Sequence, residues 1–190
     1  MTVLFFNNAG SGPVVLSSAE GLEMFLRSVA LGFQNISSLS LATGLTLPTG
    51  SQQASGSACT LSGNLLTVAG TVTGVFATNQ IVIGTGIPAN TYILGPGHLA
   101  NTLLLSQNCT TESAETVTAY QQIKVDYAII RASTANVNWR DDGTAPTSAT
   151  GFPMLSTDGP MLYASNLLGI QFIAQSGSPT LQVSYYCFSG

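Results

Sequence analysis

The chain has 190 residues, enough for one domain carrying a small inserted module, and 45% of them are hydrophobic, which argues against extensive disorder. Only 6% are charged, against about 25% in an ordinary soluble domain. Four scattered basic residues and a net charge of −4 argue against a nucleic-acid-binding surface. A surface with so few charges indicates a chain that packs against other proteins in an assembly.

Two further features concern location. No apolar run reaches the roughly 18 residues needed to cross a bilayer, so we expect no membrane partner. Residues 1–6 lack the basic segment of a secretory signal, which predicts synthesis and use in the cytoplasm.

The N-terminal 35 residues are predicted to be an arm that includes one short helix. Ser17 and Glu20 have the spacing of a capping box. Apolar residues then recur at helical spacing, namely Leu22, Phe25, Leu26, Val29 and Phe33. We favour a helix from Ser17 to about Val29. The alternative is a strand from Arg27 to Gln34, because Val29, Leu31 and Phe33 also alternate.

The middle of the chain is predicted to hold an inserted module. Residues 36–58 open the main domain, and their last eight residues, SQQASGSA, have the composition of a linker. Residues 59–119 contain short apolar runs separated by Gly, Asn and Pro turns. Short strands at this spacing indicate a small, separate β-module.

From residue 120 to residue 190 the predicted strands are longer. Ile123, Val125, Tyr127 and Ile129 alternate with more polar residues, as in a strand with one buried face. Similar strands follow at 136–139, 168–172 and 180–188. Residues 36–58 and 120–190 together therefore predict an all-β fold, an antiparallel β-sandwich, with a jelly roll as the favoured version.

One segment of this region carries a specific motif. It is WRDDGTAPT, formed by Trp139, Arg140, Asp141, Asp142, Gly143, Thr144, Ala145, Pro146 and Thr147. With VDYAIIRAS before it and LGIQFIAQSGSPTLQVSYY after it, the motif resembles that of small virion proteins of tailed bacteriophages. The resemblance implies a virion β-sandwich associated with the capsid, in which these residues are a structural motif.

The chain departs from that family between residues 48 and 127. Compact members pass quickly from a segment like Gly44–Pro48 to a strand like Tyr127–Ile130, whereas here residues 59–119 intervene. Their GTGIPANTYI segment resembles a β-module found in phage fibre and surface proteins. The resemblance therefore also implies an inserted phage surface module.

We expect no catalytic, cofactor or metal site. Asp141 and Asp142 could form an acid–base pair or bind Ca²⁺, but Asp-Asp-Gly is also a common turn sequence, which we favour. His98 lies in a Gly-Pro-Gly-His loop without a recognisable nucleophile or metal-ligand pattern. Trp139 is interpreted as a core or sheet-face aromatic rather than a sugar-binding platform. The expectation is that the protein is not an enzyme.

The three cysteines do not form a disulfide framework. Cys187 continues the Leu181, Val183, Tyr185 alternation and is predicted to be buried and reduced. Cys59 and Cys109 bracket the insert and could lie close enough to pair after cell lysis.

Two functions remain open. The first is a capsid decoration or cement protein, located on the capsid surface of a virion, bound to the major capsid protein and to itself as a dimer or trimer. The alternative is a tail, fibre or baseplate component that binds a host-surface glycan. The lack of long repeats and of a heptad run favours the first.

Overall fold

The structure is a computed structural model that describes residues 4–6, 13–15 and 28–188. Every regular element among these residues is a β-strand, and all paired strands are antiparallel, so the protein is all-β as predicted. In chain order the strands are β1 (Leu4–Phe6), β2 (Pro13–Val15), β3 (Ser28–Ile36), β4 (Thr43–Gly44), β5 (Thr49–Thr67), β6 (Val72–Gly74), β7 (Ile81–Ile83), β8 (Ile93–Pro96), β9 (Thr102–Gln122), β10 (Tyr127–Ser133), β11 (Val137–Arg140), β12 (Phe152–Met154), β13 (Met161–Tyr163), β14 (Gln171–Ala174) and β15 (Thr180–Phe188). Nowhere in the described part of the chain is there a helix that could span a membrane.

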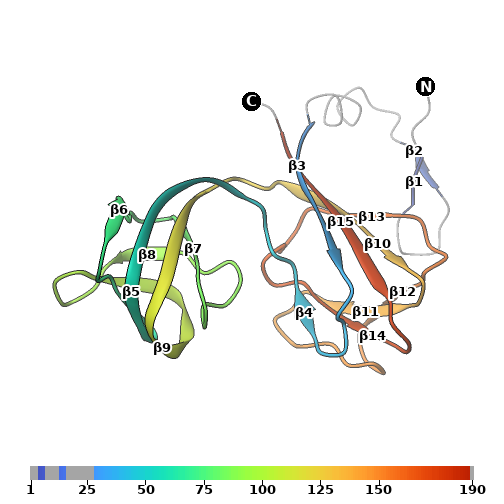
Figure 1. The fold of residues 1–190 in the computed structure, drawn as a ribbon. Coiled ribbons are helices and arrows are strands. Elements are labelled where there is room, and N and C mark those ends of the chain that lie inside the picture. The colour runs from blue at the N-terminus through green and yellow to red at the C-terminus, as the bar shows by residue number, and fades with distance from the viewer. Residues whose placement is uncertain (1–3, 7–12, 16–27, 189–190) are drawn as a thin grey trace. The chain divides into compact units, whose positions relative to one another are not determined.

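The chain divides into two compact units. Thr49–Ile123 forms one, which we call the inserted unit, and the chain before and after it forms the other, which we call the jelly-roll unit. Figure 1 shows β5 to β9 in the inserted unit and β3, β4 and β10 to β15 in the jelly-roll unit. Among the described strands, β1 and β2 pair with each other alone.

Eight strands of the jelly-roll unit form two four-stranded sheets, ordered β13-β10-β15-β3 and β12-β11-β14-β4. The first of the eight pairs with the last, the second with the seventh, the third with the sixth and the fourth with the fifth. These pairs are β3–β15, β4–β14, β10–β13 and β11–β12, all antiparallel. Nested pairing of this kind, divided between two sheets, is the strand order of a jelly roll. The favoured version of the predicted sandwich is therefore confirmed.

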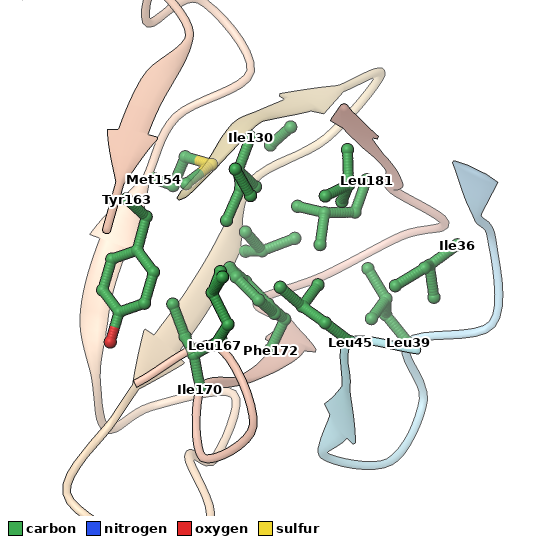
Figure 2. Close-up of a cluster of buried hydrophobic side chains, with 14 of the residues drawn as sticks. Ile36, Leu39, Leu45, Ile130, Met154, Tyr163, Leu167, Ile170, Phe172 and Leu181 are labelled. Carbon is green, nitrogen blue, oxygen red and sulfur yellow. The ribbon is translucent and has the colours of Figure 1, made fainter. Parts of the chain in front are cut away.

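The core of the jelly-roll unit lies between its two sheets. The alternation of Leu181, Val183 and Tyr185 along β15 places all three against the other sheet, each no more than 2% exposed. Figure 2 shows apolar side chains from both sheets meeting there. Those labelled are Ile36, Leu39, Leu45, Ile130, Met154, Tyr163, Leu167, Ile170, Phe172 and Leu181.

The inserted unit is built on the long pair β5 and β9, which are 19 and 21 residues in length. Along its other edge β9 pairs with β8 near its beginning and with β7 near its end. A bridge joins Ile81 of β7 to Tyr92, the residue before β8, so the sheet curls over a core of its own. Its buried members are Ala54, Cys59, Leu61, Leu66, Val82, Ile93, Leu105, Cys109, Val117 and Ala119.

The predicted linker at residues 51–58 is wrong, because this segment is part of β5. Ala54 is 2% exposed and pairs with Ala119 of β9. A Cβ at Gly56 would lie 2.9 Å from the sulfur of Cys59, so the packing leaves no room for a side chain at this position. The predicted module boundaries at 59 and 119 consequently fall inside β5 and β9, and the unit extends from Thr49 to Ile123.

The prediction for the N-terminal arm also needs correction. Ser28–Ile36 is strand β3, paired with β15, so the helix does not extend to Val29 and residues 28–35 belong to the sheet. The alternative strand from Arg27 to Gln34 is confirmed for its described residues. The rest of the predicted helix, residues 17–27, lies outside the described residues.

We predict that the jelly-roll unit folds without the inserted unit. The two cores share no residue, and Thr49 lies opposite Gln122 in the strand register, so a short Gly/Ser bridge can join Pro48 to Lys124. The shortened chain should retain a β-type circular dichroism spectrum and one cooperative transition in the fluorescence of Trp139, the only tryptophan. An insoluble or unfolded product would contradict this independence.

Candidate functional site

The WRDDGTAPT motif begins at the end of β11, where Trp139 packs against two other aromatic rings. Its ring centroid lies 5.2 Å from that of Phe152, its neighbour on β12, in a tilted arrangement. The ring of Tyr163, on β13 of the other sheet, meets it edge-on at 6.0 Å. Trp139 is half-buried, so it is a packing residue that joins the two sheets, in line with its interpretation as a core or sheet-face aromatic.

Asp141 adds a polar link between the same two sheets. The hydroxyl of Tyr163 donates a hydrogen bond of 2.7 Å to Oδ2 of Asp141. Burial raises the pKa of Tyr163 above its ordinary value, and the bond to the Asp141 carboxylate raises it further. The Tyr163 hydroxyl therefore remains a donor over the whole physiological range.

Asp142 makes a different set of contacts. It forms an ion pair with Arg140, whose Nε lies 3.1 Å from Oδ1, and it accepts the Thr144 backbone N–H at 3.0 Å. Gly143, between them, has a φ of 81°, which a side chain would strain. These are the contacts of a tight Asx-type turn.

The electrostatics of this turn follow from its hydrogen bonds. The Arg140 guanidinium, with help from the Thr144 N–H, lowers the pKa of Asp142 to about 2. Asp141 and Asp142 are thus engaged by separate donors on separate elements, Tyr163 of β13 and Arg140 of β11. Pro146 is buried at the far end of the motif.

Asn138 is a site residue that the sequence reasoning missed. It is 5% exposed, and its Nδ2 donates to the carbonyls of Thr147 and Ser148 at 3.0 Å each. Its Oδ1 accepts a bond of 2.7 Å from Gln175. Asn138 therefore holds the end of the motif loop against the sheet. The only sequence signal was a polar residue between Val137 and Trp139 in an apolar strand.

The motif also borders a small hollow of about 310 Å³, lined by Arg140, Asp141, Asp142, Gly151 and Phe152. Phe152 is 60% exposed there. The charged groups of the hollow already bind one another or Tyr163. This arrangement stabilises the loop and leaves mainly the Phe152 ring for contact with another molecule.

A second concavity lies on the inserted unit. It has a volume of about 700 Å³ and no charged residue among its lining side chains. The lining residues are Val68, Ala69, Gly70, Val72, Phe76, Asn101, Thr102 and Leu103. Its mixed apolar and neutral polar lining suits an uncharged ligand.

The remaining candidate residues are not brought together. His98 is exposed in the loop before β9. Within the described ranges, no group of three or more His, Cys, Asp and Glu side chains is placed to hold a metal ion.

The cysteines differ from expectation. Cys59 lies opposite Glu115 and Cys109 opposite Gly63, so the two are separated by at least four positions along β5, too far for a disulfide. Cys187 is half-buried rather than buried. It lies opposite the exposed Val29, where β15 passes the end of the core.

Comparison of the chain with protein families, with curated proteins and with solved structures gave no match.

We predict that Tyr163→Phe destabilises the jelly-roll unit by about 1–2 kcal/mol, because it removes a hydrogen bond to a carboxylate that joins the two sheets. Urea unfolding followed by Trp139 fluorescence measures the change. Tyr186→Phe is the matched control, since Tyr186 stacks on Tyr127 through its ring. Equal stability of the two variants would contradict the role of the Asp141 link.

We also predict that the Asp142 carboxyl titrates near pH 2 in a carbon-13 NMR titration, below its ordinary value of 3.8. Because the folded-state pKa is the lower one, the ion pair stabilises the fold above about pH 4 and is lost as the pH falls through 2. The effect on stability is small, since the pair is solvent-screened. Arg140→Gln should raise the midpoint, whereas Lys124→Gln should not. An unchanged midpoint in Arg140→Gln would show that Arg140 is not the cause.

Proposed function

We propose that this protein is a non-enzymatic structural component of a tailed-phage virion, a decoration or cement protein that works as a homo-oligomer on the capsid. The observation that carries the proposal is the character of its surface. Among the described residues, twelve large apolar side chains are at least 40% exposed, and the whole chain has only twelve charged residues. Such a surface favours burial in an assembly.

Two further observations support the proposal. The jelly roll is an architecture used by viral capsid proteins, although a fold alone does not determine a function. The WRDDGTAPT motif, which resembles that of small phage virion proteins, makes contacts that hold two sheets and a turn together. Its two carboxylates are occupied by these structural contacts, which is the support for a non-enzymatic role.

The test is the abundance and the effect of the protein in virions. Quantitative mass spectrometry of purified particles should give a copy number comparable to that of the major capsid protein. Particles lacking the chain should release their DNA at a lower temperature than complete particles, because many modest interfaces act together in a cement layer. A handful of copies, or an unchanged release temperature, would contradict decoration.

The uncharged concavity of the inserted unit favours a second candidate, a tail, fibre or baseplate component that binds a neutral host-surface glycan. A low copy number together with antibody labelling at the tail would support it. Replacement of Phe76, which lines this concavity, should then reduce attachment to host cells, whereas Leu168→Ala, at an exposed residue of the jelly-roll unit, should not.

A further inference from the structure

The two sheets of the jelly-roll unit have four edge strands, and these differ in how open they are to pairing. β13 and β12 are three residues long, and β12 contains Pro153, which cannot donate a backbone hydrogen bond. β4 has two residues. Short strands and prolines are the usual means by which proteins protect sheet edges. β3, with nine residues, lacks both of these protections.

The amino-acid composition around β3 also offers no protection against pairing with another strand. No residue between 28 and 48 is charged, so the lysines and other charges that usually block an edge are missing. Among the described residues β3 pairs only with β15, on one side. Figure 1 shows β3 beside β15, with β10 and β13 following across the sheet. Within the described ranges, the other edge of the Gly32–Ile36 part of β3 therefore presents backbone donors and acceptors without a strand partner.

The segment available for pairing is Gly32–Ile36. A bulge interrupts the register between Ala30 and Gly32, and beyond it five residues match Leu181–Tyr185 of β15 without a shift. Phe33, opposite Ser184, lies on the face away from the core and is 60% exposed. Asn35 is exposed on the same face. An incoming strand would thus gain both backbone hydrogen bonds and contact with an aromatic side chain.

We propose that this edge binds the same edge of a second copy of the chain, by antiparallel pairing of Gly32–Ile36 about a two-fold axis. Identical strands match each other's hydrogen-bonding groups in antiparallel order, and a segment without charge brings no like-charge repulsion to the axis. The two sheets would join into one sheet of eight strands. The proposal deepens the proposed function, since it rests on self-association and names the surface and the stoichiometry.

The geometry makes the stoichiometry specific. A two-fold pairing of one edge with itself closes at two copies and leaves no β3 edge for a third. Phe33 and Asn35 of one copy would lie across from, or diagonal to, the same positions of the other copy. Lysine at either position would then place like charges next to each other.

The experiment measures the mass of the purified full chain by light scattering at about 50 µM, a concentration at which a dimer with a Kd of about 1 µM is mostly formed. The wild type should have the mass of two chains. Phe33→Lys and Asn35→Lys should each halve that mass while retaining the circular dichroism spectrum of the fold. Hydrogen exchange in the β3 peptide should be slower in the wild type than in either variant.

The control is Leu168→Lys, which adds the same charge at a residue that is 54% exposed in the same unit but lies outside any strand. It should remain a dimer. A wild type that is monomeric or trimeric, or a dimer that persists in both β3 variants, would overturn the proposal. These outcomes are separate from the virion measurements, which test decoration: a chain can decorate a capsid as a monomer, and it can dimerise through β3 without decorating one.

Discussion

The pairing of β3 with β15 is the constraint on which the rest of the jelly-roll unit depends. The strands lie about 150 residues apart in the chain, yet they form the longest pairing of the unit. β15 is also the central partner of β10, so it carries two of the three strand contacts in its sheet. The buried side chains of the other sheet therefore have the whole apolar surface against which they pack only after β15, the last strand, has paired with β10 and β3.

The insertion leaves the strand pairing of the jelly-roll unit unchanged. It lies between the second and third strands of the roll, and its first residue, Thr49, lies opposite Gln122, the residue before its last, in the register of β5 and β9. A chain that leaves and returns at neighbouring points changes the connection between two strands without changing their pairing. Long insertions at such a connection cost little additional loop-closure entropy. The inserted unit has a core of its own, whose buried members all lie between Ala54 and Ala119.

Buried polar groups hold the roll at selected points. The Tyr185 hydroxyl donates to Oε1 of Gln34 at 2.7 Å, and the Thr46 N–H donates to the same oxygen. Burial strongly raises the pKa of Tyr185, so this hydroxyl stays protonated and remains a donor. Together with Asp141 and Tyr163, this contact ties segments that are distant in sequence, which apolar packing alone specifies less sharply.

The fold class could be predicted because the long strands alternate, as Leu181, Val183 and Tyr185 do, and this alternation is local information. The errors arose where small residues are compatible with two kinds of structure. Ser, Gln, Ala and Gly in residues 51–58 suit a linker, but here they suit close packing, as at Gly56. The polar contacts of Asn138 and Asp141 could not be predicted, because their partners lie on other elements and only the fold brings them near.

The motif at residues 139–147 shows which part of the function a sequence signature can carry. Its tryptophan packs between sheets, its first aspartate bonds to Tyr163, and its second aspartate closes a turn with Arg140 and Thr144. A signature that contains such contacts marks a fold, because these residues hold the two sheets and the turn together. What distinguishes one such protein from another must then lie outside the motif, on surfaces that the packing leaves free to vary. In this chain those surfaces include the uncharged edge of β3 and the inserted unit, where the proposed partners would bind.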